Sequence, residues 1–349
     1  MNNTALIAMS GGVDSSVAAW LTINEGFRCI GANMELFTKD GAGDTEDARA
    51  VATRLGIPFH VIDAREPFRT QVMDRFVCCY EAGLTPNPCY DCNKALKFGF
   101  LLDKALELGC DAVVTGHYAR IRRDEKTGRY LLRKAADESK DQSYFLAGLS
   151  QHQLSHTRFP LGELTKSQAR EIAENQGFVN ARKRDSQDIC FVPDGDYMAF
   201  LERHTGKIYP QGAFLDMDGK TVGTHRSAVA YTLGQRKGLG LAMGAPVYVC
   251  GKDMAANTVT VGPNEALFHK VLRADNWNWM PFPALTQPLR VMAKARSRMT
   301  EQPATVYPED NGFARVEFDE PQRAITPGQA VVLYDGDTVI GGGTITEVL

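Results

Sequence analysis

A glycine-rich turn near the start of the chain limits what this sequence can fold into. Residues 10–16 read SGGVDSS, directly after the apolar run 5–9 and directly before the helix-like run 17–21. Glycine lets backbone N–H groups approach a ligand closely, and the helix that follows presents its positive end to an anion. The pattern predicts a strand, a phosphate-binding turn and a helix, and it differs from the Walker A and GxGxxG patterns. The alternative is a tight polar turn that binds nothing.

Apolar and amphipathic segments alternate through the first part of the chain. Strands are expected at residues 5–9, 29–34, 59–62 and 112–115, with helices at 15–25, 46–55, 67–82 and 93–108. Such alternation is typical of an α/β fold with a doubly wound parallel sheet, which binds ligands at the carboxyl ends of its strands. The glycine turn and Gly116 both follow expected strand ends.

After about residue 205 the pattern changes to short alternating segments separated by Gly, Pro and Asn. Examples are residues 245–249, 258–261, 314–318, 330–334 and 338–344, whereas helical signal remains at 166–176 and 197–203. This pattern predicts small β-sheets or barrels. We therefore expect a nucleotide-binding domain at 1–204, a small β-rich central domain at 205–268 and a C-terminal β-barrel at 269–349.

Composition narrows the class of protein without naming an activity. The chain has no apolar run near the length of a membrane span, and its first residues lack a secretory signal, which predicts a cytoplasmic protein without membrane partners. Its eight cysteines then read as reduced thiols, metal ligands or catalytic sulfurs. With 39 basic and 42 acidic residues the net charge is −3, so any affinity for nucleic acid must come from local basic patches.

Two basic patches exist. Residues 117–140 hold eight Lys and Arg against four acids, and residues 276–300 hold four Lys and Arg without an acid. Phosphate contacts by such residues would bind RNA, and the nearby Trp277, Trp279 and Phe282 would stack bases. Taken alone, the patches fit a solvated, alternating strand edge better than an RNA-binding surface.

Two segments bring cysteine chemistry. Cys89 and Cys92 have the CxxC spacing, which lets two sulfurs converge on a metal or form a redox pair, but no second CxxC completes a zinc site. Cys190 follows the basic run Arg182-Lys183-Arg184, and cationic neighbours favour the thiolate that nucleophilic or persulfide chemistry requires. A buried, inert thiol at Cys190 fits the sequence equally well.

Taken together, these segments resemble the tRNA-specific 2-thiouridylases of the MnmA/TrmU family, within the PP-loop ATP pyrophosphatases. The resemblance extends over nearly the whole chain, through SGGVDSS, Met34, PNPCYDCNKALKF, TGHYA at 115–119, KDQSYFL at 140–146, SQDICFV, YTLGQRKGLG at 231–240, residues 294–298 and TPGQA at 326–330. It implies a PP-loop domain of the adenine nucleotide alpha-hydrolase type, a small central domain and a C-terminal barrel that together hold the anticodon stem-loop.

The resemblance also implies a reaction, the ATP-dependent 2-thiolation of the wobble uridine. ATP would be held by Met34, Gly116 and the turn residues Ala8, Met9, Ser10, Gly11, Gly12, Val13, Asp14 and Ser15, with Asp14 placing Mg²⁺. Cys190 would receive sulfur as a persulfide from a cysteine desulfurase or a relay protein. Cys92 would attack that persulfide to free hydrosulfide, or form a disulfide with Cys190.

One departure from the family pattern concerns Cys89. Many members have an aspartate there, the expected general acid or base, and Asp91 is a possible substitute. An alternative is that Cys89, Cys92 and Cys190 hold a 4Fe-4S cluster with one open iron, because three converging thiolates suit iron and sulfide. A third reading gives Cys89 no cofactor role.

By the same matching, a set of residues is expected at the tRNA. Asn87, Pro88 and Cys89 would border the target base, and His117, Lys140, Asp141, Gln142, Arg296, Ser297 and Gln329 would contact the RNA. Two rival classes remain, namely another AMP-forming PP-loop synthetase and a CxxC iron or redox protein. The synthetase would not need the CxxC or the barrel, and the redox protein would not need the glycine turn.

Overall fold

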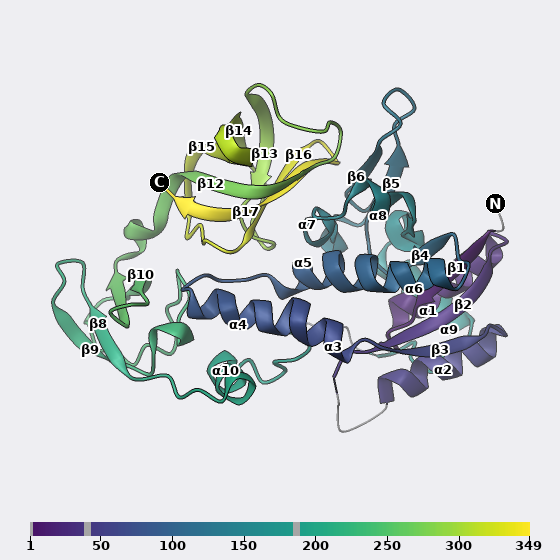
Figure 1. Cartoon of the computed structure of the whole chain (residues 1–349), viewed down its shortest axis with the longest axis horizontal. Helices are drawn as coiled ribbons and strands as arrows, with labels where there is room; N and C mark the ends of the chain where they lie inside the picture. The colour runs from purple at the N-terminus through teal and green to yellow at the C-terminus, as the bar shows by residue number, and fades with distance from the viewer. Residues whose placement is uncertain (1–2, 38–42, 184–188) are drawn as a thin grey trace.

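The computed structural model describes residues 3–37, 43–183 and 189–349 (Figure 1). Its first sheet has the order β3-β2-β1-β4-β7 with every strand parallel, which confirms the predicted doubly wound sheet. The strands are β1 (Thr4–Ala8), β2 (Arg28–Glu35), β3 (Phe59–Asp63), β4 (Ala112–Val114) and β7 (Thr157–Arg158). Because β1 lies between β2 and β4, the strand order reverses beside it, and ligands bind at such a point.

Helices cover both faces of this sheet because side chains alternate along β1. Ala5 and Ile7 pack with α1 (Val13–Asn24), α2 (Gly43–Leu55) and α9 (Lys166–Asn175), whereas Leu6 packs with the helical run on the other face. That run consists of α5 (Pro88–Cys92), the π-helical η2 (Asn93–Phe100) and α6 (Leu101–Glu107). The predicted helix at 67–82 is a similar composite of α3 (Arg65–Phe68), η1 (Arg69–Met73) and α4 (Asp74–Glu81).

Smaller elements complete the first domain and lead to the central one. They are α7 (Ser143–Leu146), α8 (Gln151–Ser155) and α10 (Tyr197–Thr205). The central sheet has the order β10-β11-β8-β9 and packs over a small core around Phe214. Its strands are β8 (Gly212–Leu215), β9 (Thr221–His225), β10 (Tyr248–Asp253) and β11 (Thr258–Gly262).

The C-terminal strands form a closed barrel, as predicted. They run β12-β15-β14-β13-β16-β17, and β12 also pairs with β17, which closes the ring. Closure leaves no unpaired sheet edge. The strands are β12 (Phe268–Trp279), β13 (Leu289–Lys294), β14 (Gln302–Pro308), β15 (Ala314–Arg323), β16 (Ala330–Asp335) and β17 (Thr338–Val348).

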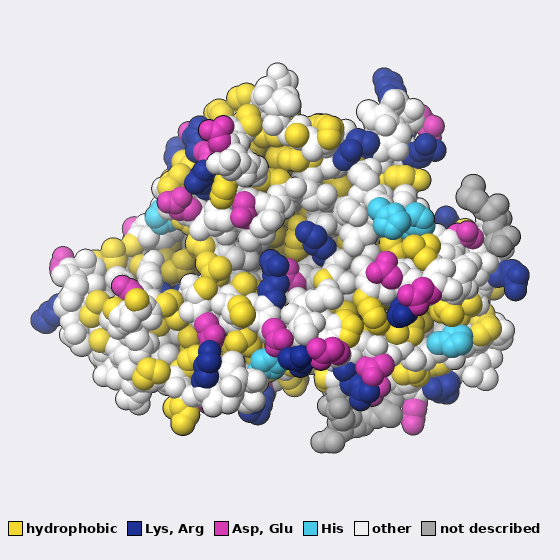
Figure 2. Space-filling view, viewed as in Figure 1, with side chains coloured by type: hydrophobic (Ala, Val, Ile, Leu, Met, Phe, Trp, Pro, Cys, Tyr) yellow, Lys and Arg dark blue, Asp and Glu magenta, His cyan; other side chains and the backbone are white. Residues whose placement is uncertain are grey.

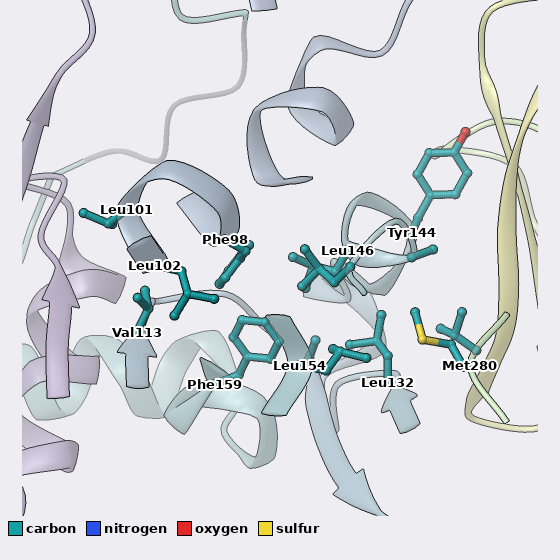
Figure 3. Packing of buried hydrophobic residues seen from close by; sticks show 14 of the residues in the cluster. Phe98, Leu101, Leu102, Val113, Leu132, Tyr144, Leu146, Leu154, Phe159 and Met280 are labelled. Carbon is teal, nitrogen blue, oxygen red and sulfur yellow. The ribbon is translucent and has the colours of Figure 1, made fainter. Parts of the chain in front are cut away.

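A hairpin that the sequence analysis did not anticipate joins the barrel to the first domain. It consists of β5 (Arg120–Arg123) and β6 (Tyr130–Arg133), within the first basic patch, and β6 pairs with β17 at Thr338. A common core runs from Phe98 through Leu132 to Met280 (Figure 3), and it also includes Leu6 of β1 and Tyr334 of β16. The parallel sheet and the barrel therefore share buried surface. No helix in the described ranges is long and apolar enough to cross a membrane.

Candidate active site

The glycine turn joins β1 to α1 as the sequence predicts. Gly11 has φ +73°, which favours glycine, and α1 begins two residues later at Val13. The backbone N–H of Ser10 donates to Ser15 Oγ at 3.2 Å, and Ser15 Oγ donates to Gly12 O at 3.0 Å. These bonds fix a tight loop at the positive end of a twelve-residue helix, a setting suited to phosphate.

Gly116 lies against this turn from the end of β4. A Cβ atom at Gly116 would stand 2.6 Å from the carbonyl carbon of Asp14 and 2.7 Å from the backbone N of Ser15. Met34 lies near the carboxyl end of the neighbouring β2, where the Asn33 side chain donates to Met9 O at 2.7 Å. The structure thus brings the residues predicted for ATP to one edge of the sheet.

Asp14 has a cationic partner that the sequence analysis missed. Lys166 Nζ donates to both carboxylate oxygens of Asp14, at 2.8 and 2.7 Å, and Tyr118 Oη donates to one of them at 2.9 Å. The Lys166 side chain is only 12% exposed, so the ion pair is shielded from solvent. A half-buried carboxylate suits Mg²⁺ as a ligand, and a lysine beside it suits phosphate.

Two further polar residues hold the turn from the segment before Cys190. Asn180 Nδ2 donates to Gly11 O and to Ser16 Oγ, both at 3.0 Å. Lys183 Nζ lies 3.4 Å from Gly11 O, and it also lies 2.8 Å from Asp44 Oδ1 and 2.6 Å from Asp47 Oδ2 on α2. Residues 184–188, which carry the end of the predicted basic run and the start of SQDICFV, lie outside the described residues.

The CxxC segment begins a helix. Asn87 caps α5 by accepting a bond from the backbone N–H of Tyr90 at 3.3 Å, and Pro88 occupies the first turn. Cys89 is exposed and Cys92 half-buried. Asp91, the possible substitute for the family aspartate, instead pairs with Arg75 at 3.2 Å, and burial raises the pKa of the Asp91 carboxyl.

Cys190 lies near Cys92 and Cys89. Loss of water around the thiol, with the charges of Cys92 and Cys89 as smaller causes, raises the pKa of Cys190 to about 11. The Cys190 side chain is exposed, and Lys97 is a cation that opposes this rise in pKa. Because Arg184 lies outside the described residues, the expected effect of the basic run on the Cys190 thiolate stays a prediction. Lys97, which the sequence analysis left without a role, opposes the rise in pKa at Cys89, Cys92 and Cys190.

The three thiols do not form a metal-binding set in this structure. Within residues 3–37, 43–183 and 189–349, no three His, Cys, Asp or Glu side chains are grouped to hold an ion. The arrangement thus gives no support to the predicted 4Fe-4S cluster, and we derive no step through one.

His117 is held by its own neighbours. Its Nδ1 lies 2.7 Å from Thr115 Oγ1, its Nε2 lies 3.3 Å from Lys97 Nζ, and its ring contacts Phe98 and Phe159. Burial and the Lys97 charge lower the pKa of His117 well below its usual value. The ring is therefore neutral and accepts a bond from Lys97.

Several residues predicted at the RNA make internal contacts here. Asp141 accepts bonds from Ala135 and Ser143, and Gln142 Oε1 accepts one from the Tyr118 backbone at 2.9 Å. Lys140 ends a short 3₁₀ turn beside them. On the barrel, Arg296 Nη2 donates to Thr326 Oγ1 at 2.6 Å, and Ser297 lies half-buried in the loop after β13.

The aromatic residues expected to stack RNA bases pack on the barrel. The rings of Trp277 and Trp279 stack on each other at 4.7 Å, and Trp277, Trp279 and Phe282 contact the barrel core. On the face shown in Figure 2, Lys and Arg side chains also lie near the centre, where the barrel adjoins the α4 and α5 region. Local basic surface is therefore present on this face of the molecule.

A parallel sheet with a phosphate-binding turn, a nearby thiol group and an attached barrel defines a nucleotide-binding α/β protein of the PP-loop class. Sequence profiles described as the tRNA methyl transferase HUP domain, its PRC-barrel domain and the aminomethyltransferase beta-barrel domain match residues 3–194, 198–263 and 269–345. The chain belongs to the family of the tRNA-specific 2-thiouridylases MnmA.

The relatives match along their whole length. The 2-thiouridylase of Clostridioides difficile (strain 630) is 46% identical over 100% of this chain and 99% of its own. That of Moorella thermoacetica is 48% identical over 98% of this chain and 99% of its own. Among solved structures, a 4-thiouridine synthetase in complex with RNA and ATP is 15% identical with a TM-score of 0.37, covering 58% of this chain and 50% of that chain.

Proposed function

We propose that this protein catalyses the ATP-dependent 2-thiolation of the wobble uridine of tRNA, with release of AMP and pyrophosphate. The observation that carries the proposal is the full-length match to 2-thiouridylases, since it takes in the turn, the CxxC helix, Cys190 and the barrel together. The tRNA substrate favours the predicted cytoplasmic location.

ATP makes the uridine oxygen a leaving group. The C2 oxygen attacks the α-phosphorus of ATP and pyrophosphate departs, and sulfur then attacks C2, so that AMP leaves with the oxygen. We assign ATP binding to Ala8–Ser15, Met34 and Gly116, and we add Lys166 to this set because its ammonium group lies beside the turn. Mg²⁺, placed by Asp14, would neutralise phosphate charge.

Sulfur reaches C2 from Cys190. A cysteine desulfurase or relay protein would load Cys190 as a persulfide, and Cys92 would attack the Cys190 sulfur. As the Cys92–Cys190 disulfide forms, the outer sulfur of the persulfide leaves as hydrosulfide, which attacks C2. A dithiol reductant then restores both thiols. The proximity of Cys92 to Cys190 supports this route, since the charge of Cys92 is one cause of the raised pKa of Cys190 and the residues on either side of Cys190 pack in the same apolar cluster as Cys92.

The RNA would lie across the thiol site and the barrel. Asn87, Pro88 and Cys89 would border the base, while His117, Lys140, Asp141, Gln142, Arg296, Ser297 and Gln329 would reach the anticodon stem-loop. Recognition by shape and phosphate contacts suits a chain whose net charge is only −3.

The test separates thiol chemistry from RNA binding. Cys92→Ser and Cys190→Ser should each abolish 2-thiouridine formation from ATP, a persulfide donor and unmodified tRNA, whereas the Kd for tRNA stays at its wild-type value. Cys78→Ser, at an exposed cysteine on α4, is the matched control and should remain active. Retained turnover in either variant contradicts the assignment, and activity found only after iron–sulfur reconstitution contradicts the persulfide route.

A further inference from the structure

The barrel holds the segment that leads into the cysteine helix. This segment, residues 82–87, joins α4 to α5 and runs beside the barrel (Figure 1). The backbone N–H of Thr85 donates to Pro327 O at 2.9 Å, and Gln329 Nε2 donates to the carbonyl oxygens of Thr85 at 2.9 Å and Pro86 at 3.0 Å. One side chain of the barrel thus binds two consecutive carbonyls just before α5.

Close packing reinforces these bonds. Gly328 has φ +91°, and a Cβ atom there would stand 2.9 Å from both Leu84 Cβ and the backbone N of Thr85. On β17, a Cβ atom at Gly342 would stand 3.1 Å from the hydroxyl of Tyr90, which directly follows Cys89 in α5. The barrel therefore contacts the chain both before and after Cys89.

The segment 82–87 buries a polar group that has no hydrogen-bond partner in the part of the chain that the structure describes, which costs free energy. Thr85 Oγ1 is buried and has no hydrogen-bond partner among the described residues. Burial of a hydroxyl without a partner costs free energy. The contact with the barrel therefore keeps residues 84–86 from a conformation in which the Thr85 hydroxyl would reach water. Weakening the contact should let the segment, and the start of α5 with it, open toward solvent.

We infer that Gln329 is a positioning residue for the sulfur chemistry, because its carboxamide fixes the position of α5 and so controls the reactivity of Cys92. The inference rests on the proposed function, in which Cys92 attacks a persulfide. Thr326, in the same turn, accepts a bond from Arg296 at 2.6 Å. RNA bound at Arg296 would therefore shift the turn at residues 326–329, and with it the position of the Cys92 thiol.

The test is the rate at which iodoacetamide alkylates Cys92 in the full-length protein without RNA, ATP or sulfur donor, measured by peptide mass spectrometry across pH. Gln329→Glu keeps the shape but removes the donors. Two ordinary hydrogen bonds correspond to about a tenfold change in an opening equilibrium, so the alkylation rate should rise about tenfold. The pH midpoint should fall, since burial raises the pKa of Cys92 in the closed form.

Gln322→Glu is the matched control, because Gln322 Nε2 also donates to a carbonyl of the barrel, that of Glu320, at 2.7 Å. It should leave the rate at Cys92 unchanged. If Gln329→Glu is alkylated at Cys92 with the wild-type rate and pH midpoint, the inference is overturned, even if the Kd of this variant for RNA rises. Because the assay involves no thiolation, this result is independent of the proposed activity.

Cys29 and Cys110, which are 7% and 3% exposed, report whether a variant remains folded. If they also react in Gln329→Glu, that variant has unfolded and Gly328→Ala decides the question. Gly328→Ala retains the carboxamide but forces the turn away from Leu84 and Thr85. A tenfold faster reaction of Cys92 alone supports the inference, and a wild-type rate overturns it.

Discussion

At the scale of single residues, charge around the phosphate-binding turn is arranged by side chains from distant parts of the chain. The carboxylate of Asp14 points to the ammonium group of Lys166 and the hydroxyl of Tyr118. Because Lys166 is mostly shielded, its attraction for an anion is screened less than that of a surface lysine. We therefore expect the Lys166 ammonium group to bind a phosphate while it also pairs with Asp14.

We expect Lys166→Met to weaken binding of ATP and of pyrophosphate by about tenfold, a typical loss for one charge-assisted hydrogen bond. Isothermal titration of the RNA-free protein measures both affinities. Lys104→Met, at a lysine of α6 paired with Glu107, is the matched control. Unchanged or tighter binding would mean that Lys166 merely neutralises Asp14.

At the scale of elements, the site depends on the close approach of two strand ends. The chain after β4 passes so near the turn after β1 that Gly116 has no room for a side chain. The helix after that turn can point its free N–H groups at phosphate only while Asp14 and Ser15 keep their positions. A single methyl group at Gly116 should therefore displace the phosphate site.

Gly116→Ala should abolish measurable ATP binding and lower the free energy of unfolding by about 1–3 kcal/mol, through overpacking against backbone. Urea unfolding and ATP titration check the two effects. In the control Gly251→Ala, on β10, the nearest atom to the new Cβ is Thr260 Cβ at 3.6 Å, an ordinary contact. Wild-type ATP affinity in Gly116→Ala would show that the turn at residues 10–16 still binds ATP after it is displaced.

At the scale of the whole molecule, the first domain and the barrel are joined by a shared core and by charge. Asp337, in the barrel, accepts a bond from Arg120 Nη2 at 3.1 Å and from Arg133 Nε at 3.1 Å. Both arginines belong to the β5–β6 hairpin, so one carboxylate links the hairpin to the turn before β17. The first basic patch thus has a structural role in addition to any contact with RNA.

Hydrogen bonding to Arg133 lowers the pKa of Asp337, with Arg120 as a smaller cause. A lowered pKa in the folded state stabilises the protein above the unfolded pKa, near 3.9, and this contribution disappears as the pH falls through the folded value. Asp337→Asn should therefore cost about 1 kcal/mol at pH 7, a figure reduced for solvent screening because the side chain is 36% exposed.

Urea unfolding of wild type and Asp337→Asn at pH 7 and near pH 3 tests this expectation. The difference in the free energy of unfolding should shrink at the lower pH. A difference that stays constant between the two pH values would exclude ionised Asp337 as its source. Asp335→Asn, at an exposed aspartate at the end of β16, is the matched control and should change little at either pH.

The sequence alone determined the main helices and strands of the first domain and the motifs of this protein, because they depend on neighbours along the chain, whereas the β5–β6 hairpin was not predicted. Alternation of apolar segments predicted the parallel sheet, and the glycines and serines of SGGVDSS predicted its phosphate turn. The tertiary structure decided which side chains meet. Lys166 lies 152 residues from Asp14, and Gln329 lies 244 residues from Thr85, so no local pattern marks either pair. The raised pKa of Cys92 likewise comes mainly from burial, which only folding creates.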